Sequence, residues 1–283
     1  MFRKSFIAAA AVAAAALLSP SASAQTAEEI VAKHIQARGG AEKLKSVRTL
    51  RMTGKREVQP GFAVPIVVEQ MRQNRMRADF TVQGMTGTLA FDGAQGWQLM
   101  PFQGKTDPEP MPEEMIKEFA EDSDIDGPLL DWKQKGHKIE LVGKEQVEGT
   151  DAYRVKLTKK GGDTSDIWFD ADSYLELKSV SRRTVRGTVQ EMEAVTGDYK
   201  EVAGMMMPHS VQFGEKGQPK LSMTIEKIEV NPAIEEARFK MPAVAKKPEG
   251  NAPAAKPENK ETETKPADKK PDPAKPPAKP PVG

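Results

Sequence analysis

The stretch MRADFTV, residues 76–82, alternates apolar and polar side chains along its whole length. Because successive side chains of a β-strand point to opposite faces, this alternation predicts a strand with one buried and one solvated face. The same period of two returns in four further segments, at residues 50–53, 153–157, 205–213 and 221–225. Such segments, separated by turn-forming pairs of Pro, Asp and Gly, are typical of an antiparallel sheet. The sequence therefore predicts a mainly β (α+β) fold, a curled antiparallel sheet or incomplete β-barrel of about ten to eleven strands.

An N-terminal helix is expected before the first strand. Thr26 is suited to cap its start, and acidic residues follow in the first turn, where the helix dipole favours them. Ile30 and Val31 lie on the face that we expect to be buried. The pair Gly39-Gly40 ends the helix, because glycine adopts the left-handed cap conformation without steric cost.

Residues 111–135 replace the strand pattern with helical spacing. Met115, Ile116 and Phe119 form one apolar stripe. Pro128 is suited to start a second short helix, whose apolar side chains are Leu129, Leu130 and Trp132. We expect this helical insert to cover the open side of the curled sheet as a lid.

The two ends of the chain differ in composition from its middle. Residues 1–24 have a basic start, an apolar Ala-rich run and a small-residue site at Ala22-Ser23-Ala24. This pattern predicts a secretory signal peptide, cleavage after Ala24 and export to the periplasm. Residues 245–283 contain ten Pro and nine Lys and almost no aromatic or β-branched residue, which predicts a disordered tail. Residues 25–244 remain as one β-rich domain.

Charge and motifs exclude several classes of function. The formal net charge of the chain is only +1, and a nucleic-acid reader usually carries a strong basic excess, so we expect no nucleic-acid partner. The three His lie far apart in the sequence. The acidic segment 122–133 has Lys133 where a calcium loop needs its twelfth-position carboxylate. We therefore expect no metal and no cofactor, and the absence of a nucleophile motif argues against an enzyme.

A family resemblance rests on three stretches. These are ARGGAEKLKSVRTLRMTG (37–54), FDGAQGWQLMPFQGK (91–105) and WFDADSYLELKSV (168–180). Together they resemble the LolA/LolB-like superfamily, which includes the outer-membrane lipoprotein-sorting proteins of the periplasm. The resemblance spans residues 26–242. It implies an incomplete barrel whose concave apolar face is covered by helices, with acyl chains held between them.

The resemblance also implies a set of ligand-binding side chains. Together with the strand pattern, it assigns to the hydrophobic cavity and its lid Leu50, Met52, Met76, Phe80, Leu89, Phe91, Trp97, Leu99, Met115, Phe119, Leu129, Leu130, Trp132, Met205 and Met207. The expected ligands are acyl chains of lipoproteins or other lipids. A membrane-bound donor or acceptor protein is a further expected partner, and nothing in the sequence calls for more than a monomer.

Three hypotheses of function follow. The first is a periplasmic carrier that shelters acyl chains and sorts lipoproteins toward the outer membrane. The second is an envelope scaffold whose cavity is filled by its own side chains, Trp132 and Phe119 among them. The third is a hydrolase of lipid or glycan. An empty cavity beneath the insert favours the first hypothesis, a plugged one the second, and a buried carboxylate of raised pKa in the cleft the third.

Overall fold

The computed structural model describes residues 25–185 and 187–243, and within them thirteen strands form one antiparallel sheet. The predicted signal peptide and the predicted disordered tail lie outside these residues. The strands are β1 (Thr49–Gln59), β2 (Phe62–Met71), β3 (Arg75–Val82), β4 (Met85–Phe91), β5 (Gly96–Met100), β6 (Lys105–Pro110), β7 (Lys138–Val147), β8 (Thr150–Thr158), β9 (Thr164–Asp170), β10 (Glu176–Val185), β11 (Thr188–Val202), β12 (Met205–Glu215) and β13 (Leu221–Val230).

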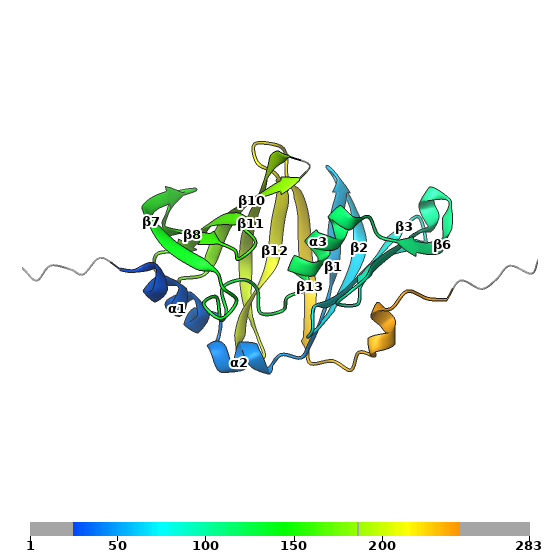
Figure 1. The fold of residues 1–283 in the computed structure, drawn as a ribbon, viewed down its shortest axis with the longest axis horizontal. Helices are drawn as coiled ribbons and strands as arrows, with labels where there is room; N and C mark the ends of the chain where they lie inside the picture. The colour runs from blue at the N-terminus through cyan, green and yellow to red at the C-terminus, as the bar shows by residue number, and fades with distance from the viewer. Residues whose placement is uncertain (1–24, 186, 244–283) are drawn as a thin grey trace, which may run out of the picture. The chain divides into compact units, whose positions relative to one another are not determined.

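The order of the strands shows how the sheet is assembled. It runs β6-β5-β4-β3-β2-β1-β13-β12-β11-β10-β9-β8-β7. Each half is therefore a meander of sequential antiparallel strands, and the pairing of β1 with β13 joins the two halves (Figure 1). Strands β6 and β7 form the two edges and are not paired with each other, so the sheet stays open.

The predicted curled, incomplete antiparallel barrel is confirmed, with more strands than the sequence pattern indicated. The clearest addition is β6, whose sequence KTDPEP has no alternation of apolar residues. A short polar edge strand of this kind buries little, so it leaves no hydrophobic period in the sequence.

The junction between β1 and β13 contains a β-bulge at Thr53/Gly54. At this point the two backbones approach so closely that a Cβ on Gly54 would collide with the carbonyl oxygen of Thr224. Only glycine allows this approach, which keeps the two meanders in register through the bulge.

Helix α1 (Ala27–Ala37) packs on the inner face of the sheet, which we define as the face that carries Leu50 and Met52. Its predicted cap is confirmed: the Thr26 hydroxyl accepts from the Glu29 amide at 3.2 Å, and the Glu29 carboxylate accepts from the Thr26 amide at 2.9 Å. Ile30 and Val31 are fully buried. They form one apolar cluster with side chains of β8 and β9, Val155, Leu157, Ile167 and Phe169. The short helix α2 (Ala41–Ser46) follows directly.

The segment between β6 and β7 begins with helix α3 (Glu113–Asp122), which contacts β3 and β4. The second helix predicted from Pro128 onward is not formed. Residues 125–136 run as successive turns instead, and Gly127 and Asp131 have positive φ angles of 63° and 55°. Residues in that left-handed region cannot continue a right-handed helix.

The outer face of the sheet, opposite to Leu50 and Met52, carries charge networks. Glu69, only 2% exposed, accepts from Arg51 at 2.9 Å and from Arg238 at 2.6 Å. Asp166, also 2% exposed, accepts from Arg154 at 2.9 Å and Arg182 at 2.6 Å. The 3₁₀ helix η2 (Glu236–Phe239) packs on this same face. The outer face thus combines buried charge networks with an apolar cluster of its own, formed around Ala152, Trp168 and Val180.

Replacing Gly54 by Ala tests the junction. We expect the Gly54→Ala variant to lose about 1–3 kcal/mol of unfolding free energy, because the added methyl overpacks against backbone. Gly197→Ala is the matched control, since a Cβ on this β11 glycine meets nothing within 4 Å, and it should change stability by less than about 0.5 kcal/mol. Urea unfolding of both variants measures the difference. Equal stability of the two would show that the junction tolerates a side chain.

Candidate functional site

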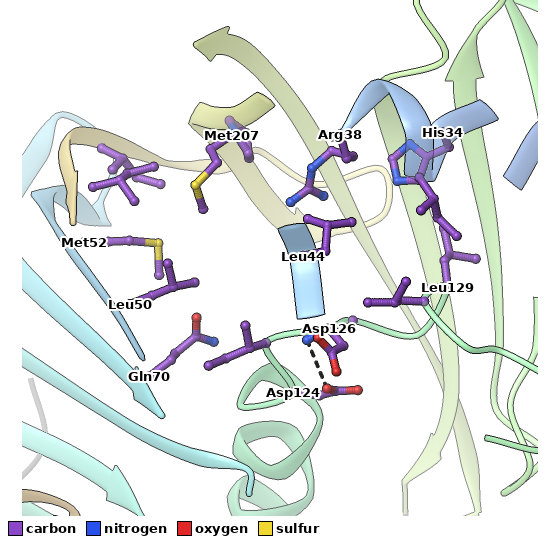
Figure 2. A pocket seen from close by; sticks show the side chains of 17 residues that line it. His34, Arg38, Leu44, Leu50, Met52, Gln70, Asp124, Asp126, Leu129 and Met207 are labelled. Atoms are coloured by element: carbon purple, nitrogen blue, oxygen red, sulfur yellow. Dashed lines mark hydrogen bonds between the residues drawn. The ribbon is translucent and has the colours of Figure 1, made fainter. Parts of the chain in front are cut away.

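A cavity of about 260 Å³ lies on the inner face, beneath the turns that follow α3 (Figure 2). Its walls come from α1, α2, β1, β2, β12 and β13, and residues 124–130 form its roof. The apolar lining consists of Ile35, Leu44, Leu50, Met52, Ile125, Leu129, Leu130, Met207, Pro208, Ile225 and Ile228. The polar lining is much shorter: His34, Arg38, Gln70, Asp124 and Asp126.

The junction of the two meanders supplies the floor of the cavity. Met52 of β1 lies directly opposite Ile228 of β13, and beyond the bulge Gly54 lies opposite Ile225. Since cross-strand partners share a face, these apolar side chains all point inward. Met207 from β12 adds a flexible thioether, which adapts to irregular apolar shapes.

Arg72, in the turn after β2, holds the roof to the body of the protein. Its guanidinium donates twice to the Asp126 carboxylate, at 2.8 Å each. The same side chain donates to the carbonyl oxygens of Val47 at 2.5 Å and Lys45 at 2.9 Å. Asp126 raises the pKa of Arg72, so the guanidinium stays charged. One arginine therefore fastens the roof to the connection between α2 and β1.

Two further polar contacts support the roof. The Gln70 side-chain amide donates to the carbonyl oxygen of Asp122 at 2.7 Å, at the end of α3. The Lys135 ammonium donates to the Asp124 carboxylate at 2.5 Å and to the Gly127 carbonyl at 2.6 Å. The roof is thus held by polar side chains while its apolar residues face the cavity.

His34, on the wall formed by α1, is neutral. Its Nδ1 donates to the Tyr174 carbonyl oxygen at 2.9 Å, and its ring centroid lies 4.7 Å from that of Phe169. Burial lowers the pKa of His34 to about 4, because the charged imidazolium would lose its hydration.

Five of the predicted ligand-binding residues line this cavity: Leu50, Met52, Leu129, Leu130 and Met207. Met205 lies in the same apolar cluster as Leu50 and Met207. Four more, on β3 and β4, lie on the inner face outside the cavity: Met76, Phe80, Leu89 and Phe91.

Trp97 and Leu99 lie on the outer face, so their assignment to the cavity is wrong. Trp97 pairs across the strands with Ala90, and Ala90 pairs with Arg77, which belongs to the charged face. The Trp97 indole donates to the buried Phe239 carbonyl at 2.8 Å. The hairpin pattern of residues 91–105 does not reveal which alternate set of side chains points inward.

The remaining three predicted residues belong to the segment between β6 and β7. Met115 lines a separate, largely polar cleft of about 1000 Å³ beside the β8–β9 and β10–β11 turns. Phe119 is half-buried on α3 and does not line the cavity, and Trp132 packs against the cluster around α1.

Sequence reasoning missed the polar part of the lining and several apolar residues. Ile225 and Ile228 had a detectable signal, because Ile225 ends the predicted strand segment 221–225 and Ile228 lies further along the same strand, β13. His34 and Arg38 had none that separated them from an ordinary helix end.

A buried carboxylate of raised pKa in the cleft would favour the hydrolase hypothesis, and Glu176 is a buried carboxylate of this type. Burial raises the pKa of its carboxyl group. However, Glu176 lines none of the cavities described above.

In the part of the chain that the structure describes, no group of three or more His, Cys, Asp or Glu could hold a metal ion. None of the helices in residues 25–185 and 187–243 is long and apolar enough to cross a membrane.

Comparisons with known proteins bear on the fold. No family model matches the chain, and no curated protein matches it in sequence. A LolA superfamily protein from Nitrosomonas europaea is similar in structure, with a TM-score of 0.52 and 13% identity over 77% of this chain and 98% of that one. A DUF1329 family protein from Desulfovibrio piger has a TM-score of 0.53 and 10% identity over 76% and 97%.

A third structure is described as a putative outer membrane lipoprotein-sorting protein domain, from Vibrio parahaemolyticus. It has a TM-score of 0.50 and 13% identity over 75% of this chain and 94% of that one. At these identities the likeness is one of fold. The fold that the resemblance to the LolA/LolB-like superfamily implied is thus confirmed.

Removing the Arg72 guanidinium should loosen the roof. We expect the Arg72→Leu variant to lose about 2 kcal/mol of unfolding free energy, since charged hydrogen bonds contribute about 1.5–3 kcal/mol. Amide hydrogen exchange of residues 123–130 should become faster. Lys200→Leu is the control, because it breaks an exposed ion pair with Asp198 and should cost less than about 1 kcal/mol. Unchanged exchange in the roof would show that Arg72 does not fasten it.

The neutral state of His34 predicts a pH dependence of stability. Its folded pKa of about 4 lies below the ordinary value of 6.5, so the unfolded chain binds more protons between these values. Stability should therefore fall as the pH drops from 6.5 toward 4, by up to about 3 kcal/mol from this residue. The His34→Phe variant keeps an aromatic ring and should show a shallower fall in unfolding free energy between pH 7 and 4.5. Parallel curves would contradict the assignment.

Proposed function

We propose that this protein is a periplasmic binding or carrier protein for acyl chains, of lipoproteins or of free lipids, with a role in lipoprotein sorting. The observation that carries the proposal is the apolar cavity on the inner face, roofed by a segment that polar side chains fasten from outside. A scaffold with a self-filled interior would require Trp132 and Phe119 to fill that cavity. Neither residue lines it.

The size of the cavity matches part of an acyl chain. Ligand pockets usually measure about 300–1000 Å³, and 260 Å³ lies just below that range. Each buried methylene contributes about 0.8 kcal/mol, so a long chain needs more apolar surface than the closed cavity offers. The apolar residues of β3 and β4 extend the inner face under α3, and a displaced roof would join them to the cavity. Binding and release are then a shift between closed and open populations.

The remaining parts of the proposal follow from the chemistry. Transport of this kind needs burial and release and no covalent step, so the protein is not an enzyme. Export by the predicted signal peptide would place it in the periplasm, where a membrane-bound donor or acceptor protein would load or unload it. The fold shared with LolA-superfamily and lipoprotein-sorting structures supports this reading.

The first test is native mass spectrometry of the mature protein purified from its own periplasm, followed by solvent extraction. A bound lipid or acylated peptide would support a carrier and name its cargo. A clean apo mass, together with no uptake of 1-decanol in solution, would contradict the proposal and favour the scaffold.

Filling the cavity should abolish binding. Leu44 reaches into the cavity from α2 and is half-buried, so Leu44→Trp adds side-chain volume that can occupy the cavity (Figure 2). We expect this variant to lose at least tenfold in affinity for acyl ligands, with little change in stability. Val189→Trp, at a β11 residue that is 61% exposed, is the control and should bind as the wild type does. Equal affinity of both variants would place the ligand elsewhere.

A further inference from the structure

The charges that line the cavity do not cancel. Asp126 is neutralised by Arg72, and Asp124 by Lys135, through the ion pairs that hold the roof. His34 is neutral, as shown above. The fourth ionisable lining residue is Arg38, which makes no ion pair in the described part of the chain. The cavity therefore carries one uncompensated positive charge.

Arg38 is fixed in position and directed inward. It follows α1 as the capping residue, and its Nε donates to the Met206 carbonyl oxygen at 2.8 Å. The next residue, Gly39, packs so tightly against β12 that a Cβ there would lie 2.7 Å from the Gly204 carbonyl oxygen. The guanidinium extends into the ring of lining side chains, between Met207 and Leu44 (Figure 2). Its two terminal NH₂ groups have no hydrogen-bond partner among the described residues.

The nearest candidate for a counter-charge does not fill this role. Arg38 lowers the pKa of the Glu176 carboxyl group, an effect smaller than that of burial, and no ion pair joins the two among the described residues. Burial is the largest effect on this group and raises the pKa of the Glu176 carboxyl group. A structural arginine would normally use its donors on protein acceptors, whereas among the described residues Arg38 uses only one of its five N–H groups in this way.

We propose that Arg38 binds the acidic headgroup of a single-chain amphiphile whose tail lies along Leu50, Met52, Ile225 and Ile228. This inference rests on the proposed function and narrows its ligand to acidic amphiphiles. A guanidinium matches a carboxylate or a phosphate through paired, charge-assisted hydrogen bonds. The small volume admits one chain, and the apolar floor receives it while the head stays at the end of α1.

The test compares decanoate with 1-decanol, which have chains of equal length and differ in charge. Isothermal titration calorimetry at pH 7.5 on the mature protein measures both affinities. We expect the wild type to bind decanoate about tenfold to hundredfold more tightly than 1-decanol, which is the range for hydrogen bonds to charged groups. Arg38→Gln should remove this preference and leave the affinity for 1-decanol within about twofold. Arg48→Gln is the control, since Arg48 is exposed and does not line the cavity.

A second variant separates the effect of the positive charge of Arg38 from that of its paired donors. Arg38→Lys keeps the charge without the paired donors, and we expect it to retain part of the preference for decanoate. Circular dichroism confirms that each variant is folded. Inorganic phosphate should not compete with decanoate, whereas decyl phosphate should, which distinguishes an amphiphile from a free anion.

The outcomes separate this inference from the proposed function. Equal affinity of the wild type for decanoate and 1-decanol would overturn the role of Arg38 and leave an acyl carrier intact. A preference unchanged in Arg38→Gln would overturn it as well. Failure of both ligands to bind would contradict the proposed function itself.

Discussion

The pairing of β1 with β13 is the constraint on which the rest of this structure depends. It joins two meanders into one sheet and leaves β6 and β7 at opposite edges. The chain must then cross from one edge to the other between residues 111 and 137, and it does so over the inner face (Figure 1). The roof of the cavity is thus a consequence of topology. The Gly54 bulge lets the two strands approach, and the residues on either side of it form the floor.

Two networks of buried acids and arginines lie on the outer face, away from the cavity. The acidic groups buried on the outer face, Glu69 and Asp166, are each paired with two arginines and need no solvent. The lining of the cavity on the inner face is mainly apolar, and Arg72, Gln70 and Lys135 hold its roof. A roof held by a few ionic contacts can open at a cost of a few kcal/mol, which is the range in which a ligand or a partner shifts populations. Arg38 stands apart because none of the described residues neutralises it.

Much of the fold could be predicted from the sequence, because alternation of side chains along residues such as 76–82 reports burial on one face directly. The cap of α1 and the helix at residues 113–122 were also predictable, because capping residues and helical spacing are local features of the sequence. The face on which Trp97 lies could not be predicted, since alternation does not show which of the two sets of side chains points inward. The turns after Pro128 depend on positive φ angles at Gly127 and Asp131, which tertiary contacts impose. Arg38 and Arg72 gained their roles only through partners far away in the sequence.

The most direct test of the central claim is hydrogen–deuterium exchange of the mature protein with and without saturating decanoate, followed peptide by peptide. If the connection across the sheet roofs the binding cavity, residues 123–130 and the β1–β13 junction should exchange more slowly when ligand is bound, while the outer-face helix η2 should not change. Protection confined to other regions, with no effect on the roof, would contradict the account.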